Sequence, residues 1–233
     1  MSEEDWRRKA VFAGMHLELL GPREFDRSSF NDAFGNENIA AARLFFLLAD
    51  DLDGLEVAMA DLERTLAEEY RIAAMVFEDP PRRTHARISW TLARHRTHHA
   101  KVFVCIMRRF WRLLDTAYNE RASYPRRMKA AVEIAWRQNR FFFGTYIASR
   151  DAIEHVDSKV GDGRRRIPES FTMGKLHVIE GAACDVTPKA LQVAIDVWEA
   201  LAKAANQEGE RVFGSMLWRA RLLRAMRYRA ESR

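Results

Sequence analysis

The sequence is poor in the residues that break regular structure or cross-link a chain. Its 233 residues include only 11 glycines and 6 prolines, which favours long helices over many short strands. Its two cysteines form neither a disulfide framework nor a metal-ligand pattern. The apolar runs 44–49 and 102–107 are far shorter than the roughly 18 residues of a membrane span, and the acidic N-terminus does not resemble a secretion signal. We therefore expect a cytoplasmic protein that does not enter a membrane.

The composition that is present is that of a folded, basic protein. Hydrophobic residues make up 48% of the chain and charged residues 30%, and the formal net charge is +5. Arginine binds phosphate bidentately and stacks on bases, so this charge suits a nucleic-acid partner. A chain rich in Ala and Arg for compositional reasons alone would have the same charge, so the charge permits RNA binding without indicating it.

The spacing of apolar residues predicts an all-α fold, a helical bundle in one domain over 1–233. Helices are expected over the ranges 5–20, 37–51, 53–79, 84–120, 125–160, 187–206 and 211–229. A short turn joins the two longest of these, 84–120 and 125–160, which should form a long antiparallel pair as the core of the bundle. The aromatic and β-branched residues of 171–179 predict a small β-hairpin near residues 170–180.

One cluster in the sequence combines residue types that can carry chemistry. Arg150, Asp151 and His155, here called the Arg150–His155 motif, fall near the end of the helix expected over 125–160. Asp151 and His155 are four residues apart, so on a helix they share a face, where the carboxylate can orient the imidazole and raise its pKa. An acid–base group, a carboxylate and a fixed cation suit phosphodiester cleavage. A structural interpretation is open as well: Arg150 and Glu154 have the spacing of an ordinary surface ion pair.

The spacing Arg150-Asp151-x-x-x-His155 resembles the R-x4-H motif of the HEPN superfamily, over roughly residues 84–160. The stretch also resembles a group of bacterial helical proteins with an Arg-Asn-x-x-Glu-His-x-Asp signature. The HEPN resemblance implies a helical bundle that forms a homodimer and cleaves RNA without metal or cofactor. Among RNAs, tRNA is a candidate partner. It also implies a toxin or phage-defence setting, in which an antitoxin or other regulatory partner restrains the activity.

Under this resemblance the motif residues have distinct roles. His155 transfers a proton, Arg150 stabilises the charge that develops on the phosphate, and Asp151 positions the side chains; a requirement for the 2′-hydroxyl makes RNA the substrate. Two positions depart from the family pattern. Asp151 stands where many members have Asn, and Asp157 stands where an aromatic residue is common. The negative charge of Asp157 would repel a nearby phosphate.

Other charged and aromatic residues have competing interpretations. Arg94, Arg96, Arg140 and Lys159 are the cations expected to contact RNA. His95, His98 and His99 lack a third ligand at a recognisable spacing and are surrounded by cations, so no metal site is expected. The C-terminal run 218–229 is basic and amphipathic, and core packing is favoured over a grip on phosphates. Trp136 and the aromatic run 141–143 fall within the apolar stripe and are expected in the core.

Three functions therefore remain open from the sequence. The leading one is a metal-independent endoribonuclease acting at a dimer interface. The second is a catalytically silent helical module that binds a nucleotide or a protein, and the third is a structural bundle without a ligand.

Overall fold

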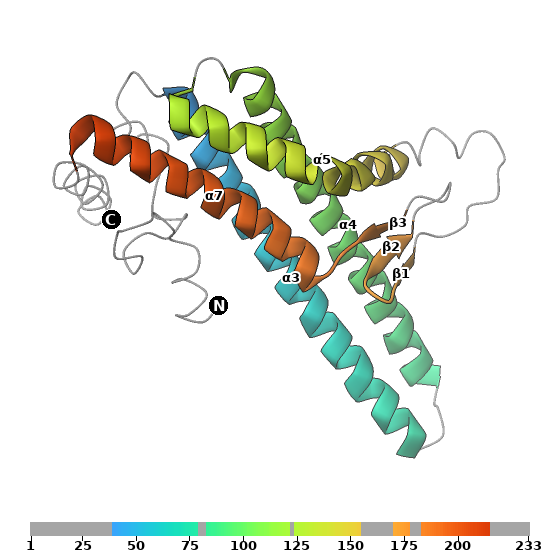
Figure 1. The fold of residues 1–233 in the computed structure, drawn as a ribbon. Helices are drawn as coiled ribbons and strands as arrows, with labels where there is room; N and C mark the ends of the chain where they lie inside the picture. Colours follow the sequence, from blue (N-terminus) through green and yellow to red (C-terminus); the bar gives the residue numbers. More distant parts are fainter. Residues whose placement is uncertain (1–38, 79–82, 122–123, 155–169, 178–182, 215–233) are drawn as a thin grey trace. The chain divides into compact units, whose positions relative to one another are not determined.

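A computed structural model describes residues 39–78, 83–121, 124–154, 170–177 and 183–214, and these residues confirm the all-α bundle with a small sheet (Figure 1). The helices are α3 (Ile39–Glu78), α4 (Arg83–Asn119), α5 (Arg126–Glu154) and α7 (Pro188–Phe213). The strands are β1 (Ser170–Thr172), β2 (Lys175–His177) and β3 (Ala183–Asp185). No helix among the described residues is long and apolar enough to cross a membrane.

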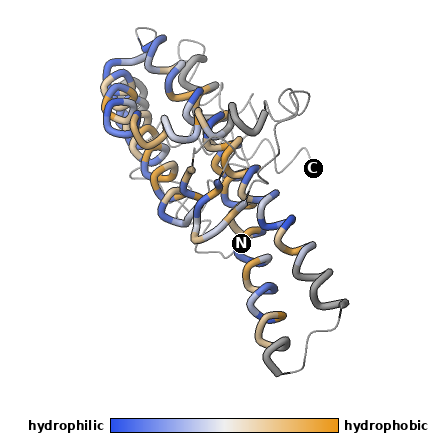
Figure 2. The backbone as a smooth tube through the Cα atoms, turned by 90° about the vertical axis from the view of Figure 1, so that its right-hand side faces the viewer, coloured by the Kyte–Doolittle hydropathy of each residue, from blue (hydrophilic) through white to orange (hydrophobic). Residues whose placement is uncertain are grey.

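The chain forms two compact units, each assembled from several segments, so no single point in the sequence separates them. Unit 1 contains the described parts of 1–53, 109–140 and 192–233. Unit 2 contains the described parts of 54–108 and 141–191. Apolar and polar residues are interleaved along the helices (Figure 2), which is the pattern of helices with one buried face.

Unit 1 is held together by large side chains from four helices. Each of these side chains is at most 1% exposed, and burying one contributes about 1.5–3 kcal/mol. They are Leu48 and Leu52 of α3, Phe110 and Leu114 of α4, Val132 of α5 and Leu201 of α7.

Unit 1 also contains a buried carboxylate. Asp51 is 1% exposed, and its Oδ1 accepts a hydrogen bond from Nε of Arg109, while Oδ2 is buried without a hydrogen-bond partner. Asp50, on the neighbouring position of α3, is largely exposed and lies 3.3 Å from the same guanidinium. Burial raises the pKa of Asp51 to about 6, against the opposing effect of Arg109.

Unit 2 packs the second half of α3 against the first part of α4, with the small sheet and the end of α5 completing its core. Leu55, Leu62, Phe103 and Met107 are almost fully buried. At Gly54 an added Cβ would lie 3.0 Å from Cδ1 of Ile106, so this glycine allows the side chain of α4 to approach α3 closely.

The sheet of unit 2 is antiparallel in the order β1-β2-β3. Phe171, Leu176 and Cys184 are paired across the three strands and are all buried, so one face of the sheet is apolar. Met173 and Gly174 have positive φ in the turn between β1 and β2. The turn is fixed to the chain after β3, because Val186 N donates to the Gly174 carbonyl at 2.7 Å.

The helix boundaries differ from the sequence prediction in two places. The predicted break between 37–51 and 53–79 is wrong, since α3 is continuous there and Gly54 serves packing instead of a turn. Gly209 was expected to precede a new helix, but α7 continues through it to Phe213. The hairpin near 170–180 is confirmed, and the sequence did not predict its third strand, β3. The helices predicted over 5–20 and, beyond Phe213, over 211–229 lie outside the described residues.

We expect Asp51→Asn to change how stability depends on pH. Because the folded-state pKa is raised from 3.8 to about 6, Asp51 favours the folded state at low pH, and this contribution is lost as pH rises through 6. Relative to wild type, the variant should therefore gain up to about 3 kcal/mol of unfolding free energy between pH 4 and pH 8, measured by urea denaturation. Asp50→Asn, at an exposed carboxylate, is the matched control. Parallel pH profiles for wild type and Asp51→Asn would contradict the assignment.

Candidate functional site

The Arg150–His155 motif straddles the described end of α5. Arg150 and Asp151 belong to the last turn of this helix, which ends at Glu154, and the structure describes their backbone only. His155, Asp157 and Lys159 lie outside the described residues. The structure therefore shows that α5 carries Arg150 and Asp151. That the side chains of Arg150, Asp151 and His155 lie close together stays a prediction.

The turn of α5 that precedes the motif is anchored in unit 2 by two buried polar side chains. Tyr146 is fully buried, and its hydroxyl donates to the carbonyl of Asp185 in β3 at 2.6 Å. Ser149, also fully buried, donates to the carbonyl of Thr145 at 3.0 Å. The Tyr146 bond ties α5 to β3 one turn before Arg150, whereas the Ser149 bond lies within α5, and a functional group gains precision when its supporting element is rigid.

The anchor also contains a buried thiol. Cys184 of β3 is 2% exposed, and burial raises its pKa to about 11, against a hydrogen bond with the side chain of Ser149. A thiol with this pKa is almost wholly protonated at neutral pH and is a poor nucleophile. Cys184 therefore acts as a small packed side chain beneath the end of α5, with no chemistry of its own.

The expected RNA-contacting cations have different environments. Arg94 is exposed on α4. Arg96, two residues later, forms an ion pair with Glu69 of α3 at 2.6 Å, and its side chain is only 24% exposed. Arg140 is exposed on α5 and lies over the ring of Trp136, 5.6 Å from its centroid. Arg140 and Arg94 are thus accessible to a ligand, while Arg96 is committed to the contact between α3 and α4.

The histidines of α4 form no metal centre among the residues that the structure describes, where no group of three or more His, Cys, Asp or Glu side chains could hold an ion. The rings of His98 and His99 meet edge to face with centroids 5.7 Å apart. Burial lowers the pKa of His99 against the attraction of Asp61, and His98 lowers it further. These side chains form a polar face of α4.

The sequence predicted that Trp136 and the aromatic run 141–143 of α5 all lie in the core, and for Phe141 this prediction is wrong. Phe143 is fully buried, but Phe141 is 78% exposed and Trp136 is half-buried. The apolar stripe is interrupted because the residues of a helix advance by about 100°, so adjacent aromatic residues cannot all share one face. Because Trp136 is only half-buried, its ring is available for a contact with a ligand. Periodicity alone had assigned this residue to core packing.

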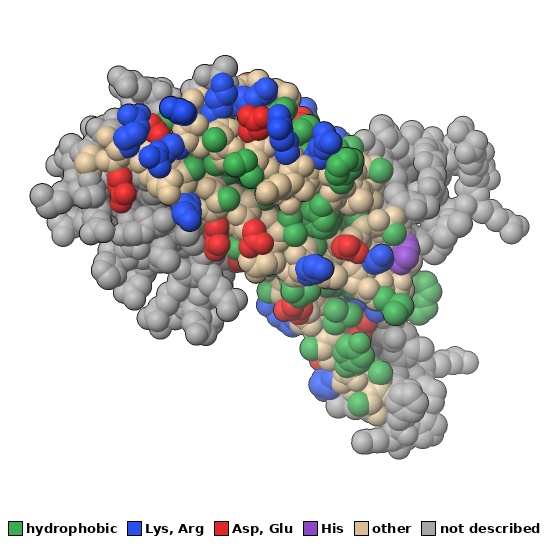
Figure 3. Space-filling model, in the orientation of Figure 1, with side chains coloured by type: hydrophobic (Ala, Val, Ile, Leu, Met, Phe, Trp, Pro, Cys, Tyr) green, Lys and Arg blue, Asp and Glu red, His purple; other side chains and the backbone are tan. Residues whose placement is uncertain are grey.

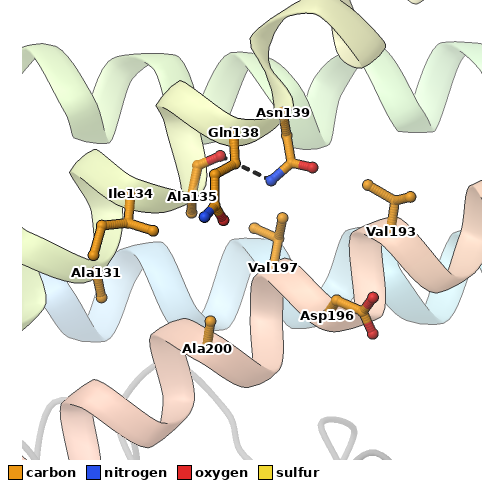
Figure 4. Close-up of a pocket in the computed structure, with 9 residues that line it drawn as sticks. All are labelled: Ala131, Ile134, Ala135, Gln138, Asn139, Val193, Asp196, Val197 and Ala200. Carbon is orange, nitrogen blue, oxygen red and sulfur yellow. Dashed lines mark hydrogen bonds between the residues drawn. The ribbon is translucent and has the colours of Figure 1, made fainter.

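A groove of about 330 Å³ lies between α5 and α7 within unit 1 (Figure 4). Small apolar side chains line most of it, including Ala131 and Ala200. Two of its polar residues are engaged locally: Asn139 donates to the carbonyl of Ala135 at 2.9 Å, and Asp196 accepts from Gln192 at 2.8 Å. The groove therefore offers shape without an acid–base pair, and it is a weaker candidate for a reaction than the end of α5.

No family model, curated protein or solved structure matches the chain.

We expect Tyr146→Phe to loosen β3 without removing the aromatic ring from the core. The substitution leaves the buried carbonyl of Asp185 without its donor, which should lower the unfolding free energy by about 1–2 kcal/mol. Urea denaturation measures this loss, and faster amide hydrogen exchange in β3 locates it. The control is Tyr70→Phe, at a tyrosine that is 76% exposed and should tolerate the change. Equal losses in both variants would show that the Tyr146 hydroxyl contributes nothing specific.

Proposed function

We propose that this protein is a metal-independent endoribonuclease whose reacting groups are Arg150, Asp151 and His155. The observation that carries the proposal is the Arg-Asp-x-x-x-His spacing at the end of α5, a helix that contains Arg150 and Asp151 and ends at Glu154. This spacing supplies an acid–base group, a carboxylate and a cation within about one helical turn.

The reaction is an internal transesterification of RNA. The 2′-oxygen attacks the adjacent phosphorus, the bond from phosphorus to the 5′-oxygen breaks, and a 2′,3′-cyclic phosphate forms. His155 removes the proton from the 2′-hydroxyl or gives one to the departing 5′-oxygen. Arg150 stabilises the negative charge that builds on the phosphate oxygens, and Asp151 orients the imidazole. DNA has no 2′-hydroxyl and cannot follow this route.

The proposed assembly is a homodimer in which two motifs line one cleft, as the HEPN resemblance implies. A second set of cations would raise the positive potential around the phosphate and help to offset the acidic Asp157. Unrestrained RNA cleavage harms a cell, so the proposal includes a toxin or phage-defence role and a regulatory partner that restrains it.

A specific observation favours one alternative, a catalytically silent helical module that binds a nucleotide or a protein. Asp157 lies two residues after His155, and Glu154 immediately before it, so the imidazole has acidic neighbours in the sequence. Carboxylates so close to a phosphate oppose the charge that Arg150 would stabilise. The two functions differ in one measurable property, cleavage that depends on His155.

We expect His155→Ala to lower the rate of RNA cleavage by at least about 100-fold, because general acid–base groups contribute this much or more. The substrate is total tRNA in the presence of EDTA, and cleavage is followed on denaturing gels. His98→Ala, which removes an exposed histidine of α4, is the matched control and should cleave as the wild type does.

Growth of cells that express each variant provides a second readout of the same substitution. Wild-type protein and His98→Ala should slow growth, and His155→Ala should not. Cleavage that is equal in wild type and His155→Ala, or that EDTA abolishes in the wild type, overturns the proposed mechanism. Binding of tRNA without cleavage by any variant would favour the silent binding module.

A further inference from the structure

Two stacked aromatic rings and a guanidinium group lie together at the end of α4 in unit 1, and we call them the Tyr118 stack. The rings of Tyr118 and Trp136 are nearly parallel, with centroids 4.1 Å apart and an interplanar angle of 8°. The guanidinium of Arg121 lies over the Tyr118 ring, 4.2 Å from its centroid. Tyr118 is thus sandwiched between an aromatic ring from α5 and a cation, and Arg121 is the outer member of the stack.

Neighbouring groups hold the stack in place. Nε1 of Trp136 donates to Oδ1 of Asp115 at 2.8 Å, and Nη1 of Arg121 donates to the carbonyl of Tyr118 at 2.7 Å. A further ring, Trp111, is only 6% exposed and lies 6.0 Å from Trp136 at 22°. Because these side chains are already held in place, a ligand that extends the stack would lose little side-chain entropy on binding.

The stack is not sealed inside the core. Arg121, Tyr118 and Trp136 are each half-buried, in contrast to Trp111 beneath them. Nucleic-acid bases stack on aromatic rings and on arginine guanidinium planes in proteins that bind single strands. A guanidinium that already lies over a ring is therefore suited to receive a base on its outer side.

Cations accompany the stack along α5. Lys129 and Arg140 are exposed and, with Trp136, share a face of the helix by their spacing of seven and four residues. Two carboxylates of this region are already engaged, because Glu133 pairs with Arg137 at 2.7 Å and Asp115 accepts from Trp136. Lys and Arg side chains gather along the first half of α5 (Figure 3). Such a surface attracts a phosphate backbone.

We propose that the Tyr118 stack and the cations Lys129 and Arg140 form a binding surface for single-stranded nucleic acid. A base extends the stack on Arg121, and the phosphates beside it contact Arg140 and Lys129. The choice of RNA over DNA as the strand rests on the proposed function. Base stacking at Arg121 does not, because it needs neither a 2′-hydroxyl nor His155. Duplexes are excluded, since their bases are already stacked on one another.

The decisive variant is Arg121→Lys, which keeps the positive charge and removes the planar group. Fluorescence anisotropy measures its affinity for a labelled 12-nucleotide RNA, with wild type and variant both carrying His155→Ala so that no cleavage intervenes. Loss of one stacked base should weaken binding about 5-fold or more. Arg64→Lys, at an arginine of α3 whose side chain is 77% exposed, is the matched control and should bind normally.

An abasic strand of the same length separates stacking from charge. The protein should bind the base-bearing RNA more tightly than the abasic strand, and Arg121→Lys should lose that preference. Arg140→Gln should instead weaken both strands alike and reduce the dependence of affinity on salt by about one phosphate contact. Thermal unfolding of each variant confirms that its fold is intact.

The outcomes separate this inference from the proposed function. Equal affinity of the wild type for base-bearing and abasic strands, or unchanged binding by Arg121→Lys, overturns the binding surface even if His155 proves catalytic. Weaker binding by Arg121→Lys with no cleavage by the wild type supports the surface and overturns the ribonuclease. Equal binding of single-stranded DNA supports stacking and overturns only the choice of RNA.

Discussion

The structure depends on the way that one face of α5 is buried in both units. Met128, Val132 and Ala135 enter the core of unit 1, and Tyr146 and Ser149 enter that of unit 2. The spacing of these residues by three and four fixes the rotation of the helix about its own axis. This rotation decides which residues of α5 remain accessible, and both proposals draw on residues of this helix.

The two proposals use α5 for different kinds of interaction. In the proposed function, the Arg150–His155 motif would provide a cation and a proton donor that act on a phosphate whatever base is attached to it. The first half of α5 carries Trp136, which belongs to the Tyr118 stack that would contact bases, and Arg140, which lies over the Trp136 ring. Nucleic-acid binding commonly divides in this way, since contacts to phosphates give affinity and contacts to bases select the form of the strand.

Buried polar groups give each unit its specific contacts. In unit 1, Asp51 is buried beside Arg109 although the pairing leaves one carboxylate oxygen without a hydrogen bond. In unit 2, Tyr146 reaches across to β3 and satisfies a carbonyl there. Burial of the Asp51 carboxylate destabilises the folded state at neutral pH, and the Tyr146 hydrogen bond stabilises it by a small amount. Packing of apolar side chains must therefore supply the net stability of both units.

The sequence alone predicted the regions of the four described helices and the small hairpin, apart from the breaks that it placed within α3 and α7, because hydrophobic spacing and turn residues are local properties of the chain. The position of the Arg150–His155 motif is likewise read from its spacing in the sequence. The sequence pattern placed a break between 37–51 and 53–79, where α3 is continuous and Gly54 lies against Ile106 of another helix. Only the tertiary structure decided that Tyr118 and Trp136 stack while Phe143 is buried, since these outcomes depend on which helix faces come together. Periodicity identifies a helix and its apolar stripe, but contacts between residues distant in sequence are set by how complete helices pack.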